Sequence, residues 1–539
     1  MAKKSPNFLF ICSDQEVNHV DLPAELELPA HARLRARGTS FSNYYVTTAP
    51  CTPSRSVIYT GQHTSATGVI TNADGPGSRD LPTDMQTLGH MLREQGYYTA
   101  YKGKWHIGGA RLPETKHPWL PPTAKDALEV YGFADFSEGG DDEGLAWGGY
   151  TRDRITAADA AQWLQDCGKK LNDESTPWCL AVNFINPHDV MWYLADEGQI
   201  SKRVHPNFGS SLKADPPAPP YDRFWDVALP PNFQDDLSDK SWCVQNYQRF
   251  WSLMSGGPNP DETDAWRRLR SYYFNCLRDM DQQLGVVLDA LDLTGQSDNT
   301  VIIFTSDHGE MLGAHGLREK GANVFKENLR VPLIVCHPDF PDGNETQAMG
   351  SAIDLIPTIL AATGLDKEQR GSRYPDLKGH DLLPTLSGGK SSRDKTGILI
   401  YNSFLMSTSD ADIVVEGIRK LITGEIQSAK AASPNMVSGV RGLIRAIHTG
   451  RYKFARYFSS GEHHCPTDWH MLTTYNDLEL YDLENDPQEL VNLAADPETH
   501  QGLILDLNRR LNGLIEREIG PDTGRELPGS PGLYQLNVV

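Results

Sequence analysis

The stretch NFLFICSDQ, residues 7–15, passes from a continuous apolar run directly into acid and amide side chains. An apolar run of this length without alternation is typical of a strand that is buried on both faces, as in a parallel sheet. In such sheets, ligands bind just beyond the carboxyl ends of the strands. Asp14 and Gln15, which follow the run, are therefore the first candidates for a functional site.

Further strand-like segments alternate with helix-like segments over the first two thirds of the chain. The strand candidates are residues 98–101, 178–184, 300–305 and 331–336, and the helix candidates are residues 85–95, 157–171, 265–293 and 353–363. This alternation predicts an α/β fold in which a large, mostly parallel sheet is sandwiched by helices. Lys104, His188 and Asp307 each follow a strand candidate, so we expect them to meet Asp14 at one edge of the sheet.

The chain of 539 residues is long enough for one large domain and a smaller one. We expect an α/β domain over residues 1–394, with an ordered insertion rich in Trp and Pro at 190–262. Short strand-like pieces, followed by an acidic helix-like stretch from residue 486 to about 519, predict a smaller α+β domain over 395–519. Residues 520–539 form a predicted tail that packs on the body or joins subunits into a homo-oligomer.

Composition excludes several classes of function. The net charge of −21 argues against a nucleic acid or an anionic membrane surface as partner. No apolar run approaches the length of a membrane span, and the N-terminus lacks a small-residue cleavage site, so we expect a cytoplasmic protein. The eight cysteines include no CxxC pair, which is typical of reduced thiols. Because the net charge is strongly negative, a site for an anionic substrate would need positive charge supplied by residues or a metal within the site itself.

The pentapeptide CTPSR at residues 51–55 has the features of a helix start. Pro53 is tolerated in a first helical turn, where its missing N–H is not needed. Cys51 would then lie at the helix N-terminus, where backbone N–H groups favour an anion. Arg55, four residues on, returns to the same face of the helix. The alternative for an isolated cysteine of this kind is a buried structural thiol.

The C-x-P-x-R pattern, within TTAPCTPSRSVIYTGQHTSATGV, resembles the signal read by the enzymes that oxidise a cysteine to formylglycine in type I sulfatases. These enzymes belong to the alkaline-phosphatase superfamily, and the resemblance extends from about residue 5 to residue 510. It implies that a formylglycine-generating enzyme converts Cys51, and that the hydrated aldehyde, a gem-diol, is the nucleophile. Arg55 would offset charge on the formylglycine and the sulfate.

Two segments resemble the metal-ligand segments of these sulfatases. The resemblance implies that Asp14 and Gln15 from the first segment, and Asp307 and His308 from the second, bind one divalent cation together with the modified Cys51. Oxygen ligands suit Ca²⁺, which is our first expectation, and Mn²⁺ or Mg²⁺ are the alternatives. Gln15 and His308, in places where the family often has Asp or Asn, resemble the choline-sulfatase and phosphonate-monoester-hydrolase branch.

Three further segments match the order of motifs in the family. KGKWHIG at 102–108 resembles the GKWHLG motif, which implies that Lys104 neutralises sulfate oxygens and that His106 removes a proton from the gem-diol. The segments NPHD and KGANVFKENLRVPLIV, which begin at residues 186 and 320, imply that His188 and Lys320 contact the bridging ester oxygen. Each of these residues has an ordinary structural alternative, namely a packed histidine or a solvated lysine.

Residues near His188 are candidates for contact with the substrate. Asp189, Trp192 and Tyr193 follow it directly, and Asn72 matches a position that often approaches the site in the family. Aromatic faces suit a sugar, an aryl ring or a quaternary ammonium such as choline. The predicted reaction is therefore hydrolysis of a sulfate monoester to alcohol and sulfate. The alternatives are a phosphonate monoester or phosphodiester hydrolase that uses the same site, and a non-catalytic binding protein that retains the fold.

Overall fold

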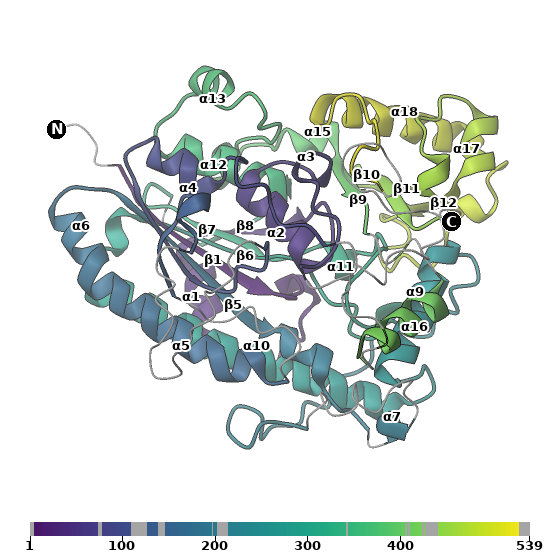
Figure 1. Ribbon diagram of the computed structural model, residues 1–539, viewed down its shortest axis with the longest axis horizontal. Helices are drawn as coiled ribbons and strands as arrows, with labels where there is room; N and C mark the ends of the chain where they lie inside the picture. The colour runs from purple at the N-terminus through teal and green to yellow at the C-terminus, as the bar shows by residue number, and fades with distance from the viewer. Residues whose placement is uncertain are drawn as a thin grey trace.

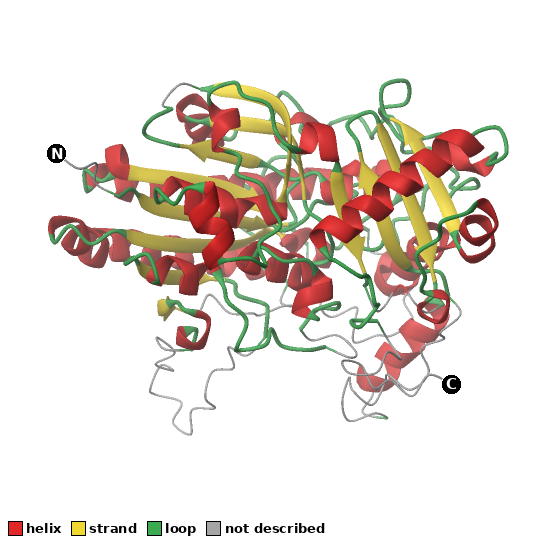
Figure 2. Cartoon of the chain, turned by 90° about the horizontal axis from the view of Figure 1, so that it is seen from above, coloured by secondary structure: helices red, strands yellow, loops and turns green. Residues whose placement is uncertain are grey.

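The structure is a computed structural model of the 539-residue chain (Figure 1). The residues that it describes are 5–73, 78–108, 127–137, 146–196, 198–201, 214–340, 343–404, 407, 410–422, 425 and 440–527. Two sheets lie side by side in this part of the chain, the larger one built from the N-terminal two thirds and the smaller one from the C-terminal third (Figure 2).

Within the described residues, the larger sheet has eight strands in the order β4-β3-β5-β1-β6-β7-β2-β8. These strands are β1 (Asn7–Asp14), β2 (Thr39–Tyr45), β3 (Tyr98–Gly103), β4 (Ala134–Ser137), β5 (Trp178–Pro187), β6 (Thr300–Ser306), β7 (Leu333–Cys336) and β8 (Asn344–Ser351). All neighbouring pairs are parallel except those of β7, which runs antiparallel to both β6 and β2. The predicted mostly parallel sheet is confirmed.

The position of strand β1 between two cores explains why its sequence is apolar without interruption. Phe8 and Phe10 point into a core that includes Val57 of the helix beginning at Cys51. Leu9 and Ile11 point into a second core on the opposite face of the sheet. Because both faces of the strand are buried, no polar residue alternates with the apolar ones.

Helices cover both faces of the larger sheet (Figure 1). On one face lie α1 (Pro29–Arg37), α5 (Gly148–Trp163) and α10 (Thr263–Leu293), and on the other lie α2 (Cys51–Thr60), α4 (Leu88–Arg93) and α12 (Leu355–Ala362). Further helices are α3 (Thr64–Thr67), α6 (Lys169–Asp173), α7 (Gly198–Ser201), α11 (Lys326–Leu329), α13 (Lys367–Arg373), α14 (Leu383–Leu386), α15 (Arg393–Thr396) and α16 (Ala411–Ile422).

Several element bounds differ from those predicted. The helix predicted at 157–171 begins earlier, at Gly148, and is interrupted by a π-helical turn over Leu164–Gly168. The strand predicted at 331–336 begins only at Leu333, because Pro332 cannot donate to a sheet ladder. The structure also contains β2, β4 and β8, which were not predicted. β8 lies at the edge of the sheet and its first five residues are not buried, so its sequence lacks an apolar signal.

The smaller sheet is antiparallel, in the order β12-β11-β10-β9. Its strands and neighbouring helices are β9 (Ile398–Asn402), β10 (Leu443–His448), β11 (Tyr452–Phe458), β12 (Asp477–Asp482), α17 (Trp469–Tyr475) and α18 (Gln501–Glu518). Figure 2 shows α18 lying across this sheet. The helix that was predicted to begin at residue 486 begins 15 residues later, at Gln501. Pro487 and Pro497 interrupt the segment before it.

The predicted insertion and tail are described in part. The insertion contains α9 (Trp242–Ser255), and Trp225 donates from Nε1 to Asn275 on α10 at 2.9 Å. In the tail, Asp522 and Glu526 accept from Arg445 of β10, both at 2.9 Å, and residues 528–539 lie outside the described part. Among the described helices, none combines the length and the apolar character that crossing a membrane requires.

Candidate active site

The carboxyl ends of four adjacent strands meet at one edge of the larger sheet. Asp14 ends β1 and pairs in register with Pro187 at the end of β5, directly before His188. Ser13 pairs with Ser306 at the end of β6, directly before Asp307. Lys104 follows β3, and its Nζ lies 2.8 Å from Oδ2 of Asp14. The four residues that were expected to meet therefore lie at the same edge of the sheet.

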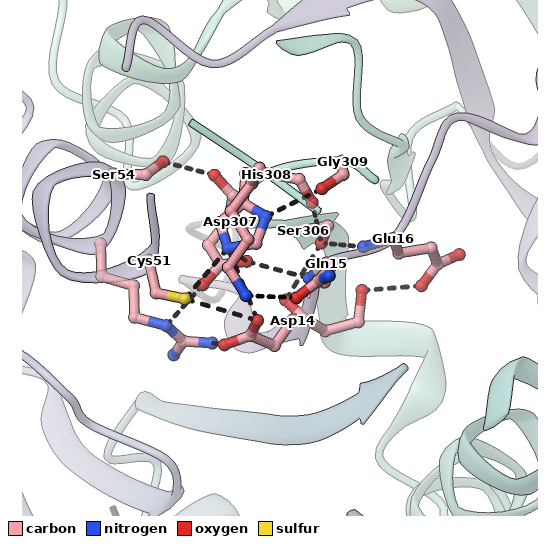
Figure 3. Close-up of polar contacts among 12 residues, drawn as sticks. Asp14, Gln15, Glu16, Cys51, Ser54, Ser306, Asp307, His308 and Gly309 are labelled. Atoms are coloured by element: carbon pink, nitrogen blue, oxygen red, sulfur yellow. Dashed lines mark hydrogen bonds and ion pairs between the residues drawn. The ribbon is translucent and has the colours of Figure 1, made fainter. Parts of the chain in front are cut away.

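A cluster of four buried side chains occupies this edge (Figure 3). One ligand atom each from Asp14, Cys51, Asp307 and His308 lies within 4.8 Å of all the others, and the four side chains are fully buried. Sγ of Cys51 is 3.0 Å from Nε2 of His308 and 3.7 Å from Oδ1 of Asp14. Two carboxylates buried together repel each other, and with an imidazole they form a donor set that fits a divalent cation.

Cys51 is the first residue of α2, as the sequence predicted. The preceding Pro50 offers no side-chain cap, but Asn72 fills part of that role by accepting from the backbone N–H of Thr52 at 3.2 Å. At the same end of the helix, Ser54 Oγ donates to the backbone carbonyl of Asp307. The start of α2 is therefore held against both the β6 loop and the segment that carries Asn72.

Arg55 joins the two carboxylates of the cluster. Its Nε donates to Asp307 Oδ2 at 2.8 Å, and its Nη2 donates to Asp14 Oδ2 at 3.1 Å. Nη1 donates to the backbone carbonyl of Lys104 at 3.0 Å and to Oδ1 of Asn183 at 3.3 Å. Because these donors are engaged by protein atoms, the guanidinium acts on the site by fixing the carboxylates.

The protonation states suit cation binding. Burial acts to raise the pKa of Asp14, but Lys104, His188 and Arg55 outweigh it and hold that pKa well below its usual range. Burial lowers the pKa of His308, so its imidazole is neutral and can act as a ligand. Burial, with the nearby Asp14, raises the pKa of the Cys51 thiol well above its usual value. An unmodified Cys51 is therefore a neutral thiol and a poor nucleophile.

Gln15 lies beside the cluster and makes contacts that its sequence position did not predict. Its backbone N–H donates to Asp307 Oδ1 at 3.2 Å, and its Oε1 accepts from Lys320 Nζ at 2.5 Å. Its Nε2 donates to Glu310 and also to Glu319 Oε2, the latter at 3.0 Å. Sequence reasoning missed these two buried glutamates, although Glu310 closes the SDHGE segment and Glu319 directly precedes Lys320. The role of Gln15 as a metal ligand stays a prediction.

His106 is fully buried and contacts Thr52, the residue that follows Cys51. Its ring lies against the hydroxyl of Thr52, with 3.3 Å between Nδ1 and Oγ1. The Thr52 hydroxyl also accepts from the backbone N–H of Ala73 at 3.1 Å. Thr52 was not singled out from the sequence, although it is the residue between Cys51 and Pro53 of the motif.

The predicted substrate-contacting residues differ in their surroundings. The Asp189 carboxylate accepts from the backbone N–H groups of Gly149 and Tyr150, at 2.8 and 2.9 Å, and burial raises its pKa to about 7. The ring of Tyr193 stacks on Tyr272 with 4.1 Å between centroids. These contacts anchor the side chains of Asp189 and Tyr193, and Trp192 is half-buried. Contact of all three with substrate stays a prediction.

Comparison with known proteins agrees with this geometry. The Sulfatase family model matches residues 6–365. The chain is 28% identical over 527 residues to a choline-sulfatase of Rhizobium meliloti (strain 1021), covering 92% of this chain and 84% of that protein. It is 25% identical over 518 residues to arylsulfatase A of Bos taurus, covering 91% and 84%.

Two solved structures share the fold at lower identity. A 2-O GAG sulfatase aligns with a TM-score of 0.67 at 21% identity, covering 97% of this chain and 94% of that one. The phosphonate monoester hydrolase of Agrobacterium radiobacter aligns with a TM-score of 0.61 at 21% identity, covering 95% and 96%. With the family model matching two thirds of the sequence, these findings confirm the predicted resemblance. The chain belongs to the sulfatase family and is a sulfuric ester hydrolase.

Proposed function

We propose that the chain hydrolyses a sulfate monoester to an alcohol and sulfate, with formylglycine made from Cys51 as the nucleophile. The observation that carries this proposal is the position of Cys51, at the start of α2 and within 4.8 Å of the ligand atoms of Asp14, Asp307 and His308. Its Sγ atom marks where an oxygen of the formylglycine aldehyde, or of its hydrate, would lie, because the conversion replaces sulfur by oxygen on the same β-carbon. The proposal makes a formylglycine-generating enzyme the maturation partner.

A bound divalent cation and the formylglycine at residue 51 would each supply one kind of chemistry. A divalent cation held by Asp14, Gln15, Asp307, His308 and the modified residue 51 would supply positive charge to the sulfate oxygens. Ca²⁺ is our first proposal for this cation, with Mn²⁺ or Mg²⁺ as alternatives, and the His308 nitrogen favours Mn²⁺ relative to a site of oxygen ligands alone. The hydrated aldehyde would supply a hydroxyl group for covalent catalysis.

The chain's own residues bind the substrate and move protons. Lys104 and Lys320 are cations that lie close to Asp14, and they bind the anionic sulfate in a protein whose net charge is −21. His106 takes a proton from the hydroxyl groups at residue 51, oriented by its contact with Thr52. His188 and Lys320 stabilise the alcohol oxygen as it leaves.

A mass measurement tests the nucleophile. Conversion of a cysteine to formylglycine lowers the mass of the peptide containing residue 51 by about 18 Da, because the thiol becomes an aldehyde. Protein isolated from its own host should show this loss in tryptic peptides. Detection of the unmodified thiol alone would exclude the proposed mechanism and favour a binding protein.

The second candidate is hydrolysis of a phosphonate monoester or phosphodiester at the same site. It is favoured by Gln15 and His308 and by the fold that the chain shares with phosphonate monoester hydrolases. The test compares kcat/KM for 4-nitrophenyl sulfate with kcat/KM for a phenyl phosphonate monoester. A large preference for the phosphonate would overturn the sulfatase proposal.

The natural substrate is proposed only by class: a small sulfated sugar, an aryl sulfate or choline sulfate. The choline-sulfatase relative makes choline sulfate the first compound to assay. Rates on the three classes, measured with the same preparation of modified enzyme, would identify the preferred one. A cytoplasmic location and a homo-oligomer formed through the tail also stay predictions.

A further inference from the structure

The side-chain amide of Gln15 is held from both ends. Its Nε2 donates to Glu310 Oε2 and to Glu319 Oε2, and its Oε1 accepts from the Lys320 ammonium at 2.5 Å. All four side chains are buried, with at most 4% of any residue exposed. Glu319 Oε2 also lies 3.4 Å from Lys320 Nζ, so the four groups form one connected network.

The chemistry of these neighbours determines which way the amide points. An ammonium group has only hydrogen-bond donors, whereas an ionised carboxylate only accepts. Because the Lys320 ammonium can only donate, the Gln15 oxygen faces Lys320, and the Gln15 nitrogen faces the oxygens of Glu310 and Glu319. In the opposite orientation, the amide NH₂ would face the ammonium and the carbonyl oxygen would face the carboxylates, which buries unsatisfied groups at a cost of about 1–3 kcal/mol each.

The carboxylate of Glu310 is itself fixed by backbone contacts. Oε1 of Glu310 accepts from the backbone N–H of Glu319 at 2.7 Å and from that of Leu312 at 3.0 Å. Gln15 and Glu319 both adopt left-handed backbone conformations, with φ of 72° and 66°. Such conformations cost about 1–3 kcal/mol in non-glycine residues and persist where the surrounding structure demands them.

We propose that Glu310 and Glu319 are positioning residues that hold the Gln15 oxygen toward the cation site and toward Lys320. The proposal rests on the proposed function, in which Gln15 is one of the cation's ligands. An amide oxygen has two lone pairs, so it can serve a cation and the Lys320 ammonium together. Cation affinity and the position of Lys320 would thus both depend on two carboxylates that touch neither the cation nor the substrate.

The test is titration of chelator-treated protein with Mn²⁺ alone, followed by isothermal calorimetry. In the Glu319→Gln variant, residue 319 can donate as well as accept, so the Gln15 amide is free to turn its nitrogen toward the site. We expect Mn²⁺ to bind about 10- to 100-fold more weakly, the usual effect of losing a partner of a metal ligand. The Glu479→Gln variant, which changes an equally buried glutamate near β12's start in the smaller sheet, should bind Mn²⁺ like the wild type.

A second substitution provides a rescue. In the Gln15→Glu, Glu319→Gln double variant, residue 15 presents oxygen in either orientation and the total charge of the network is unchanged. We expect this variant to recover most of the lost Mn²⁺ affinity, which a simple packing defect would not do. Equal Mn²⁺ affinity in wild type and Glu319→Gln, or a double variant no better than the single one, would overturn the proposal.

Two features keep this test independent of other failures. The Mn²⁺ titration needs no turnover, so it can support or overturn the positioning roles even if sulfate esters are not the substrates. If Glu319→Gln does not fold, as judged by its thermal unfolding transition, Glu310→Gln replaces it with the same expected loss and the same overturning result.

Discussion

Arg55 and Asp307 are 252 positions apart in the chain, yet Nε of Arg55 donates to Oδ2 of Asp307 at 2.8 Å with neither side chain exposed. The same guanidinium donates to Asp14 at 3.1 Å. One residue of α2 therefore joins the ends of β1 and β6 and holds two buried carboxylates side by side. Cys51, the proposed source of the nucleophile, lies four residues earlier on the same helix, with its Sγ within 4.8 Å of an oxygen of each carboxylate.

Replacing Arg55 by Ala should destabilise the protein markedly. Two buried carboxylates would lose their shared partner, which typically costs about 3–5 kcal/mol. Arg33→Ala is the matched control, because Arg33 pairs with Asp289 at the surface and exposed pairs contribute about 0–1 kcal/mol. Urea unfolding of both variants measures the difference, and equal losses would contradict the role given to Arg55.

Replacing Cys51 by Ala should abolish turnover and leave the fold intact. We expect kcat to fall by roughly 10³-fold or more, because the proposed nucleophile is lost. Removing one buried sulfur costs about 1 kcal/mol, so Tm should change by no more than about 3 °C. Steady-state assays and thermal unfolding check both expectations. A large fall in Tm with activity retained would show that Cys51 is a structural thiol.

Removing the metal should lower both activity and stability. Without a cation, Asp14 and Asp307 repel each other in a buried site, where Arg55 and Lys104 offset part of their charge at short range. A ligand at 100 times its Kd stabilises the folded state by about 2.7 kcal/mol. Thermal unfolding with a chelator, and then with added Ca²⁺, Mn²⁺ or Mg²⁺, measures the effect. An unchanged Tm in every condition would argue against a cation at this cluster.

Thr52 should influence the rate through His106. The Thr52→Val variant keeps the shape of the side chain but loses the hydroxyl that lies 3.3 Å from Nδ1 of His106. Losing one hydrogen bond of about 1.4 kcal/mol predicts a kcat about tenfold lower. Thr52→Ser, which keeps the hydroxyl, should remain within about twofold of wild type because this bond is retained. If valine and serine gave the same kcat, the hydroxyl would have no such role.

Stability should depend on pH through His31. Nδ1 of His31 is 2.6 Å from Asp281, and Nε2 is 3.1 Å from Glu16. Burial opposes protonation, but the two carboxylates raise the pKa of His31 to about 9. Because the folded-state pKa exceeds the unfolded value of 6.5, the charged histidine stabilises the fold fully below pH 6.5.

This contribution is lost as the pH rises through about 9, at about 1.4 kcal/mol per unit of pKa shift. The His31→Gln variant should therefore be much less stable than wild type at pH 6, with a gap that narrows by pH 9.5. Urea unfolding at both pH values tests this expectation. A gap that stays constant would mean that His31 stabilises by packing alone.

The sequence by itself determined the fold class, the order of the motifs and the start of α2. Local signals were sufficient for these features. Continuous apolar runs mark strands buried on both faces, and the polar residues that end such runs must lie at one edge of a parallel sheet. Asp14, Lys104, His188 and Asp307 could therefore be placed together without coordinates.

Only the tertiary structure decided what these side chains contact. The strands β2 and β8 lack a continuous apolar signal, because their burial comes from pairing with segments far away in the chain. The engagement of Arg55 with two carboxylates, and of Gln15 with Glu310 and Glu319, likewise joins residues about 250 to 300 positions apart. Such contacts depend on how loops pack at the sheet edge, and no local pattern of residues encodes that packing.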